Sequence, residues 1–271
     1  MKVADVTNDH IRLSGAAFKA GPILIVIGVV LLALSVLIGF GDGEVATTFW
    51  KSYLVGWMAA TGLQLGALFF ILLQHLTRAG WSVSTRRLAE GIARNFNWTW
   101  ILFLPIIILV MSGKGELLYQ WGNQELMQHD HMLQAKAGYL SPTFWSIRAM
   151  FFLLVWAILG TLYFRWSTLQ DQDGDVKWTH KMQKWAPIGM ILYAMTQSFA
   201  AIDWMMTMQP KWFSTMFPVY FFAATLAGFF AFIILLARFL QRTGHVRRSI
   251  TVEHYHDLGK LLFAFGTECA R

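Results

Sequence analysis

Long apolar runs dominate the chain and constrain its fold more than any other feature. Of the 271 residues, 56% are hydrophobic and 14% are charged. A helix needs about 20 apolar residues to cross the hydrocarbon core of a bilayer, and several runs approach that length. We therefore expect an all-α polytopic transmembrane helix bundle that forms a single integral membrane domain over residues 1–271. The expected spans are residues 21–40, 49–74, 97–112, 144–164, 185–208 and 212–240, with the start of a seventh at 257–265.

Both ends of the chain carry information about its processing. Residues 1–20 are mixed and polar and lack the apolar core and cleavage site of a signal peptide. The first span is therefore expected to remain as a membrane anchor. The seventh run stops after Phe265 and a different tail follows it, so we expect the sequence to be truncated at its carboxyl end.

The distribution of Lys and Arg predicts the orientation in the membrane. With six spans, and with Arg271 of the tail left out, sixteen Lys and Arg lie on the side of the amino terminus, and five lie on the other side: Lys51, Lys114, Lys136, Arg148 and Lys211. Positively charged loops stay in the cytoplasm. We therefore expect a multi-pass protein of the bacterial inner membrane with a cytoplasmic amino terminus. Its net charge of +7 reflects this topology and not a nucleic-acid partner.

Local motifs predict how some spans bend and pack. Gly62 and Gly66 form a GxxxG match that lets another helix approach closely. Pro105 predicts a kink or a break in the third span. Ahead of that span, residues 84–94 are expected to form a short surface helix, with Arg86 and Glu90 paired at i,i+4 and the arginines among lipid headgroups.

Asp203 is the charged residue that most needs an explanation. It lies near the outer end of span five in an otherwise apolar stretch. A charge at the centre of a membrane helix costs roughly 2.5–3.5 kcal/mol, and less toward the surface. Arg148, near the outer end of span four, is costly for the same reason unless it pairs or snorkels. We expect the two residues to form a buried pair, which serves either as a proton station or only as a tie between two helix ends.

Polar residues at three depths complete the set of candidate site residues. The outer candidates beside the pair are His129, Asp130, His131 and Tyr220; the mid-membrane candidates are Gln64, Thr196, Gln197 and Ser198; the inner candidates are His75, His254, His256 and Asp257. The His-Asp-His sequence suits metal binding or proton relay, and equally a polar loop tip. No catalytic residue and no complete metal site are expected, because no third ligand lies at a recognised spacing.

The sequence argues against electron transfer by this chain alone. No histidine lies within a span to ligate haem, a single cysteine cannot hold an iron–sulfur cluster, and no nucleotide-binding loop is present. Any such cofactor would belong to partner subunits. An outer acid–base cluster above a sparse polar middle suits proton or quinol handling. It also suits a secondary transporter, although that class predicts an internal repeat, and none is evident.

Four segments together resemble a known family. They are Gln74–Val83, Phe199–Trp204, Pro210–Phe222 and Ile250–Phe263. These segments are similar to the ActF-type integral membrane subunit of alternative complex III, a quinol:cytochrome c oxidoreductase, within the NrfD/polysulfide-reductase membrane-subunit superfamily. The resemblance covers residues 49–265.

The resemblance implies an NrfD-like four-helix bundle built from spans two to five, with span six starting a second bundle. It implies a cofactor-free membrane subunit of a respiratory quinol-oxidising complex, which helps to house quinol or to transfer protons. Its partners would be a sister NrfD-like membrane subunit, an iron–sulfur subunit and cytochrome c subunits, which carry the haem and the clusters. A purely structural membrane anchor for the same partners is the alternative.

The turn after Asp203 departs from the family pattern at three positions. The pattern has an acidic residue at Gln209, a histidine at Lys211 and a glycine at Pro218. The missing acid and histidine remove proton-exchanging groups, and a proline stiffens the start of span six. We therefore expect the turn to be structural and Asp203 to be the main functional residue.

Overall fold

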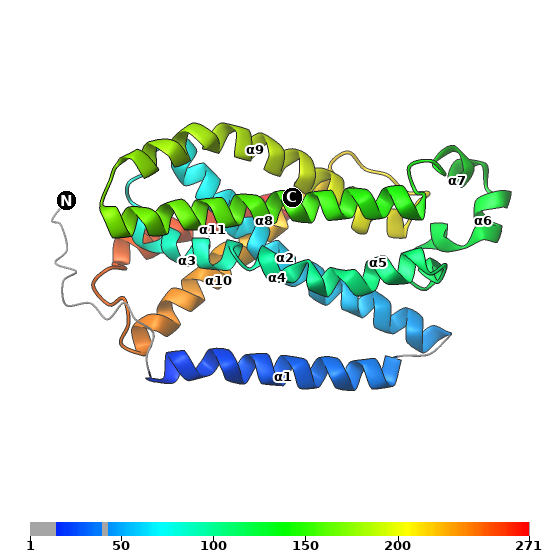
Figure 1. Cartoon of the computed structure of the whole chain (residues 1–271), viewed down its shortest axis with the longest axis horizontal. Coiled ribbons are helices and arrows are strands. Elements are labelled where there is room, and N and C mark those ends of the chain that lie inside the picture. Colours follow the sequence, from blue (N-terminus) through cyan, green and yellow to red (C-terminus); the bar gives the residue numbers. More distant parts are fainter. Residues whose placement is uncertain (1–14, 40–42, 271) are drawn as a thin grey trace.

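The computed structural model describes residues 15–39 and 43–270, which form helices and no strand (Figure 1). The long helices are α1 (Gly15–Gly39), α2 (Glu44–Leu76), α8 (Pro142–Asp173), α9 (Lys177–Trp204) and α10 (Phe217–Arg242). Within the described ranges, these five are the helices that are individually long and apolar enough to cross a membrane. The chain is therefore a multi-pass helical membrane protein.

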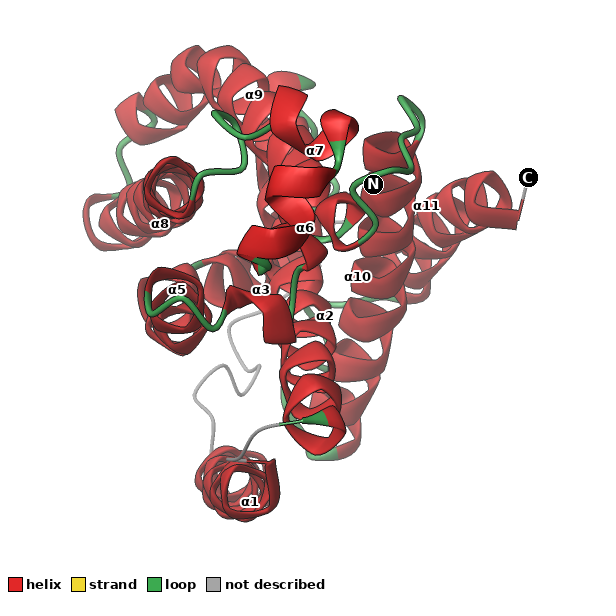
Figure 2. Ribbon diagram, turned by 90° about the vertical axis from the view of Figure 1, so that its right-hand side faces the viewer, coloured by secondary structure: helices red, strands yellow, loops and turns green. Residues whose placement is uncertain are grey.

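Shorter elements connect the long helices. They are α3 (Val83–Ala93), α4 (Phe96–Thr99), η1 (Ile101–Phe103), α5 (Leu104–Met111), η2 (Gly115–Leu117), η3 (Gln120–Gly122), α6 (Gln124–His129), α7 (His131–Ala135), η4 (Met206–Met208) and α11 (Val252–Ala270), where η marks a 3₁₀ helix. Helices α6 and α7 lie at one end of the bundle, which we call the hairpin end (Figures 1 and 2). The opposite end, where α2 ends and α3 begins, carries Arg78, Arg86 and Arg87, and we call it the arginine end.

The third expected span is broken, but not at its proline. Segments Val83–Thr99 and Ile101–Met111 meet at 46°, and only together are they apolar and long enough to count as a sixth span. The break falls at Trp100, whereas Pro105 lies in the first turn of α5, where a proline removes no helical hydrogen bond. The helix expected at 84–94 is α3, but it is not a surface helix. It leads into the broken span and buries Glu90.

Several helix boundaries differ from the expected ones. Helix α10 begins at Phe217 and not at residue 212, because Pro218 has the fixed backbone angle of a first helical turn and the residues before it form a turn. Helix α11 begins at Val252, ahead of the expected residue 257. Phe40, the expected end of span one, lies outside the described residues.

Helix α2 lies at the centre of the bundle and crosses α10 closely. A Cβ atom added to Gly66 would overlap the Phe229 Cβ and would lie 2.9 Å from the Thr225 carbonyl oxygen. A Cβ at Gly62 would lie 3.2 Å from the Thr225 Cγ2. The close helix approach predicted by the GxxxG match is therefore confirmed.

An aromatic cluster fills the bundle toward the hairpin end. The ring of Trp204 lies 4.9 Å from Phe103, 5.2 Å from Trp57 and 5.6 Å from Trp156, measured between centroids. Edge-to-face and tilted pairs of this kind add about 0.5–1.5 kcal/mol each beyond the area that they bury. The cluster therefore joins α2, the broken span, α8 and α9 into one core.

Helices α1 and α11 lie at the periphery. None of the described side chains of α1 is buried, and Figure 2 shows this helix standing apart from the others. Helix α11 packs against α10, where the rings of Phe265 and Phe230 stack at 5.9 Å. Lipid is the natural cover for the apolar surface of α1.

Candidate functional site

The expected pair of Arg148 and Asp203 is present near the hairpin end. Arg148 Nε donates a hydrogen bond of 2.7 Å to Asp203 Oδ2. Arg148 lies near the start of α8 and Asp203 near the end of α9, so the pair ties together the adjoining ends of two antiparallel helices. Asp203 is 0% exposed, and 11% of the Arg148 side chain is exposed. The carboxylate is therefore removed from solvent together with its cationic partner.

Arg148 is held on three sides. Its Nη1 donates to the Tyr139 carbonyl oxygen at 2.9 Å. The guanidinium carbon lies 3.8 Å from the centroid of the Tyr139 ring and 4.4 Å from that of Phe144. Aromatic faces attract a desolvated cation. This cradle positions the guanidinium group whether or not the carboxylate is ionised.

The backbone around Asp203 is also fixed by side chains. Its carbonyl oxygen accepts hydrogen bonds from Trp145 Nε1 at 3.0 Å and from the Thr207 hydroxyl at 2.6 Å. The next carbonyl, of Trp204, accepts from the Tyr119 hydroxyl at 3.2 Å. The last carbonyls of a helix lack partners within the helix, so these side chains terminate α9 and hold Asp203 in place.

Two polar atoms of the pair retain hydrogen-bonding capacity. Asp203 Oδ1 and Arg148 Nη2 are buried and make no hydrogen bond of normal geometry within the described residues. The Tyr139 side chain lies beside the carboxylate. Burial, and then the interaction with Asp203, raise the pKa of Tyr139, which keeps its hydroxyl protonated. The site thus presents an anionic acceptor and a cationic donor under a neutral phenol.

The His-Asp-His segment stabilises the hairpin of α6 and α7 and is not part of the Arg148–Asp203 ion pair. His129 and His131 are exposed, whereas Asp130 accepts hydrogen bonds from the Met132 and Leu133 amides and so caps α7. Asp130 Oδ2 also lies 2.6 Å from Lys211 Nζ. That bond, and then the two backbone amides, lower the pKa of Asp130.

The turn after Asp203 is the surface on which the hairpin rests. Lys211 binds Asp130, and Lys136 Nζ donates to the Pro210 carbonyl oxygen at 2.6 Å. These contacts agree with a structural role for the turn. Tyr220, the remaining outer candidate, is exposed and lines a separate apolar cavity of about 570 Å³ between α2 and α10.

The mid-membrane candidates face different helices. Gln64 exchanges hydrogen bonds with the Thr99 hydroxyl at 2.8 and 2.9 Å. Thr196 accepts from Trp156 Nε1 at 2.8 Å, and Gln197 Nε2 donates to the Pro218 carbonyl oxygen at 3.3 Å. Ser198 is half-buried. Among the described residues no direct hydrogen bond joins one of these four to another, and each bonded side chain has a partner on a different helix.

Of the inner candidates, His75 lines a cavity. Its side chain is buried, its Nε2 has no hydrogen-bond partner among the described residues, and it lines a polar cavity of about 550 Å³ at the arginine end. The others lie on the first turns of α11, where His254 Nδ1 is 2.9 Å from the Thr251 hydroxyl and Asp257 pairs with Lys260 at 3.2 Å. His256 is exposed there.

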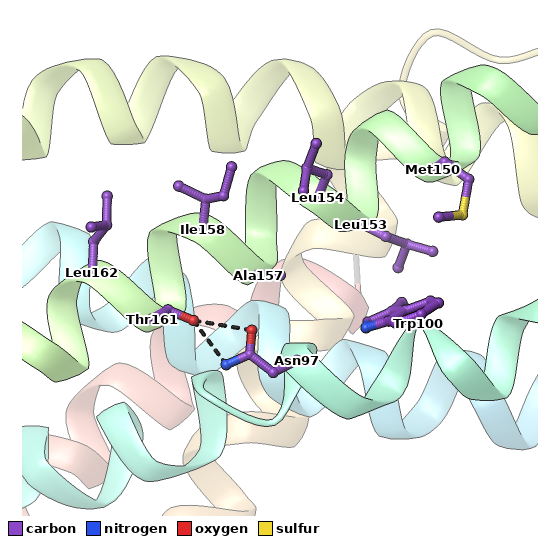
Figure 3. A pocket seen from close by; sticks show the side chains of 9 residues that line it. All are labelled: Asn97, Trp100, Met150, Leu153, Leu154, Ala157, Ile158, Thr161 and Leu162. Carbon is purple, nitrogen blue, oxygen red and sulfur yellow. Dashed lines mark hydrogen bonds between the residues drawn. The ribbon is translucent and has the colours of Figure 1, made fainter.

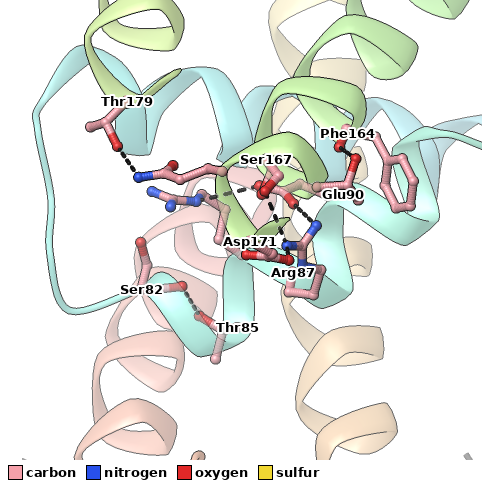
Figure 4. Close-up of polar contacts among 11 residues, drawn as sticks. Ser82, Thr85, Arg87, Glu90, Phe164, Ser167, Asp171 and Thr179 are labelled. Carbon is pink, nitrogen blue, oxygen red and sulfur yellow. Dashed lines mark hydrogen bonds and ion pairs between the residues drawn. The ribbon is translucent and has the colours of Figure 1, made fainter. Parts of the chain in front are cut away.

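The same cavity contains an ionic cluster that the sequence did not identify as a site. Glu90, 1% exposed, lies 3.5 Å from Arg86 and 3.2 Å from Arg87, and Arg87 also pairs with Asp171 of α8 (Figure 4). The i,i+4 pair of Arg86 and Glu90 was expected, but on the surface. The sequence offered one signal that Glu90 is buried. Ala89 and Ala93 lie on the same face of α3 as Glu90, and such small residues allow this face to pack closely against another helix.

The geometry defines a class of protein and the kind of site that it carries. Among the described residues no three His, Cys, Asp or Glu side chains are grouped to hold a metal ion. The protein is a membrane helix bundle with a buried ion pair at its hairpin end and a polar cavity at its arginine end. No family model matches the chain, and neither does any curated protein.

Proposed function

We propose that this chain is a cofactor-free membrane subunit of a respiratory quinol-oxidising complex, which helps to house quinol or to pass its protons and anchors redox partners. The partners are a sister NrfD-like subunit, an iron–sulfur subunit and cytochrome c subunits of a bacterial inner membrane. The proposal rests on the resemblance of residues 49–265 to the ActF-type subunit. It is supported by one observation, the buried pair of Arg148 and Asp203.

The pair suits the handling of a quinol proton. Asp203 Oδ1 is a buried acceptor beside the Tyr139 side chain, and Arg148 Nη2 is a buried donor; neither makes a hydrogen bond of normal geometry within the described residues. A quinol hydroxyl, or a water that carries its proton, would donate to Oδ1, while the developing negative charge would be stabilised by Nη2. Transfer in a water-poor site favours such prearranged groups.

The proposed arrangement assigns six spans and an orientation. The broken segment Val83–Met111 serves as the third span, and together with α2, α8 and α9 it forms the NrfD-like bundle. Helix α10 starts the second bundle, and α11 is the beginning of a seventh span. The positive-inside distribution assigns the arginine end to the cytoplasm and the hairpin end, with Asp203, to the outer side.

Replacing the carboxyl group of Asp203 by an amide tests the proton role. Asp203→Asn in the intact complex keeps the shape of the side chain and removes its ability to take a proton. Positioned proton transfer contributes roughly 10²- to 10⁴-fold to a rate, so we expect quinol oxidation to fall by at least about tenfold. The measurements are the steady-state rate with a soluble acceptor and the proton release per quinol.

A matched control separates this role from a general effect of lost charge. Asp175→Asn removes another ion-paired carboxylate, but in the exposed turn between α8 and α9 at the other end of these helices, so its rate should equal that of the parent complex. An unchanged rate and proton yield in Asp203→Asn would refute the proton role. In that case a purely structural membrane anchor is the better-supported function. The contacts that Tyr139 makes with Arg148 already favour a structural role for the pair.

The broken span is the observation that favours a transporter, since transporters use helices broken near mid-membrane. Here the backbone around the break stays bonded within turns, with Thr99 N donating to Asn95 O and Phe103 N to Trp100 O. The nearby side chains Gln64 and Thr99 are paired with each other. The Thr99 and Leu102 carbonyls at the break accept hydrogen bonds from Trp57 Nε1 and the Tyr53 hydroxyl of α2, so these groups are already satisfied within the protein, and we rank this function below the other two.

A further inference from the structure

A groove lies between the broken span and α8. It has a volume of about 480 Å³ and is bounded by Asn97 and Trp100 on one side and by α8 residues from Met150 to Leu162 on the other (Figure 3). The groove has a structural cause. The 46° break at Trp100 turns the third span away from the direction of α3, while α8 is one uninterrupted helix with the small residue Ala157 at the middle of the groove.

The floor of the groove carries two N–H donors with spare capacity. Asn97 Nδ2 donates to the Thr161 hydroxyl at 2.8 Å, and that hydroxyl lies 3.0 Å from Asn97 Oδ1. A primary amide has two N–H groups, so one remains unused. The Trp100 indole N–H forms no hydrogen bond with the described residues, and Figure 3 shows the nitrogen-bearing edge of this ring turned toward Asn97.

The depth of the groove decides what can satisfy these donors. Asn97 lies midway between Val83 and Met111, and Ala157 lies near the middle of α8. Leu154 and Ile158 are 57% and 47% exposed, so the groove opens sideways toward lipid. At this depth bulk water does not reach polar groups, and an unsatisfied donor costs several kcal/mol, about the cost of leaving a peptide group unpaired.

The lining also excludes most membrane molecules. No charged residue lines the groove, which disfavours a charged headgroup. Phospholipid ester groups lie at the interface and not at the bilayer centre, and an acyl chain has no oxygen to accept a hydrogen bond. What remains is an uncharged, lipid-soluble molecule with hydrogen-bond acceptors and a flat face that stacks on an indole.

We propose that this groove binds the ring of a lipid-soluble carbonyl compound, the chemistry of a quinone, with Asn97 Nδ2 and Trp100 Nε1 donating to its carbonyl oxygens. Its tail lies along Leu154 and Ile158. Because the free groups are donors, the groove prefers the oxidised quinone, which only accepts, over the quinol. The site is separate from the Arg148–Asp203 pair, and it rests on the proposed function only for the presence of quinone as a physiological ligand.

Photolabelling of the full chain in phosphatidylcholine nanodiscs tests the proposal. The probe is a decyl benzoquinone that carries an azide, and the labelled peptides are mapped by mass spectrometry with decylubiquinone as competitor. We expect competed label within residues 97–100 and 150–162. Asn97→Leu and Trp100→Phe should each reduce the apparent affinity about fivefold, the effect of one net hydrogen bond.

Neighbouring residues supply matched controls. Asn95→Leu and Trp98→Phe make the same chemical changes at exposed positions that do not line the groove, so they should label like the parent. Label that lies instead along the Tyr220 cavity overturns the proposal. So does competition by decane as effective as that by the quinone, because the groove would then be an acyl-chain slot, and so do equal affinities in the two variants and their controls.

The result is independent of the test of the proposed function. Labelling requires no partner subunit and no turnover, whereas the proposed function is tested by quinol oxidation in the intact complex. Competed label in the groove with an unaffected Asp203→Asn complex supports the groove and refutes the proton role. Label elsewhere with a slow Asp203→Asn complex does the reverse.

Discussion

At the scale of single residues, the pair of Arg148 and Asp203 shows why a buried charge is informative. Neither group is cheap to bury alone, and the structure compensates each with the other and with the Tyr139 carbonyl. A buried ion pair adds little net stability compared with apolar residues, but removing one of its two partners alone is costly. The two halves are not equivalent here, because Arg148 keeps a carbonyl and two aromatic rings, whereas Asp203 keeps only a neutral phenol beside it and no second cation among the described residues.

The difference between the halves predicts an order of stabilities. Arg148→Leu leaves the fully buried Asp203 carboxylate without a cation, which costs about 3–5 kcal/mol. Asp203→Asn leaves Arg148 with the Tyr139 carbonyl and two aromatic rings, so it should lower the unfolding temperature less. Tryptophan fluorescence during heating in detergent measures both. The double variant Arg148→Leu with Asp203→Leu should recover part of the loss, and an equal or smaller effect of Arg148→Leu alone would contradict the asymmetry.

Asp130 makes the docking of the hairpin depend on pH. Because the bond to Lys211 lowers its pKa in the folded protein, docking is fully present above the ordinary carboxyl pKa of about 3.9 and is lost as the pH falls below it through the folded value. Hydrogen exchange at the Met132 and Leu133 amides, corrected for intrinsic rates, should therefore accelerate at pH 3 relative to pH 7.

The neighbouring helix provides the internal control for that measurement. The Glu125 and Leu126 amides donate to Asn123, which does not titrate, so their protection should not change with pH. Asp130→Asn should accelerate the same exchange at pH 7, because an amide cannot form the ion pair with Lys211. Equal acceleration at both caps would show that acid opens the whole loop and that Asp130 is not its switch.

At the scale of elements, two close approaches determine the bundle. Gly66 brings α2 against α10, and Gly160 brings α8 within contact of α3, where an added Cβ would lie 2.7 Å from the Ala93 carbonyl oxygen. In a membrane, where lipid removes the hydrophobic drive for helix association, small residues matter because they let backbones pack. The second contact also positions Glu90 under α8.

Adding a single methyl group at Gly66 should disturb the packing of α2 against α10. Gly66→Ala places a Cβ against Phe229 and the Thr225 backbone, and overpacking of this kind costs about 1–3 kcal/mol. Gly56→Ala on the same helix meets nothing within 4 Å and should be neutral or slightly stabilising. Thermal unfolding in detergent compares the two. Equal unfolding temperatures would mean that α10 moves freely and that the crossing is not tightly packed.

At the scale of the whole molecule, the two ends of the bundle differ in chemistry. The hairpin end holds one buried ion pair under a loop, and the arginine end holds an open polar cavity with a buried Glu90. The number of crossings between them depends on the broken span: five helices qualify alone, and the bent segment adds a sixth only if its two parts form one span.

Labelling from one side of the membrane tests this topology. With Cys269, the single cysteine of the sequence, replaced by serine, Met132→Cys reports on the hairpin end and Val176→Cys on the opposite end, both at exposed positions. In spheroplasts a membrane-impermeant maleimide should label Met132→Cys and reach Val176→Cys only after permeabilisation. Leu126→Cys, also exposed, should match Met132→Cys.

The opposite order of labelling would reverse the proposed orientation. Equal labelling of both ends without permeabilisation would mean that α8 does not cross the membrane. A further cysteine at Val83, exposed at the start of α3, should behave like Val176→Cys if the broken segment crosses fully. Labelling of Val83→Cys from outside would make that segment a re-entrant loop and reduce the count to five.

The sequence by itself determined what depends on local composition. The apolar runs identify the long helices because crossing length follows from the number of consecutive apolar residues. The GxxxG match predicted the close approach of another helix, which in the structure is α10. The cost of burying charge predicted that Arg148 and Asp203 meet, since each needed a partner at the same depth. These are properties of one segment or of two segments with a shared physical demand.

Only the tertiary structure decided which polar faces are buried and what they contact. The sequence predicted that Glu90 pairs on the surface, but in the structure Glu90 is buried beside α8. His129, Asp130 and His131 form one sequence motif, but Asp130 is the residue that binds Lys211. The break at Trp100 precedes the proline that predicted it, and there the Thr99 and Leu102 carbonyls accept hydrogen bonds from Trp57 and Tyr53 of α2. Burial arises from the meeting of distant segments, which no local pattern of residues specifies.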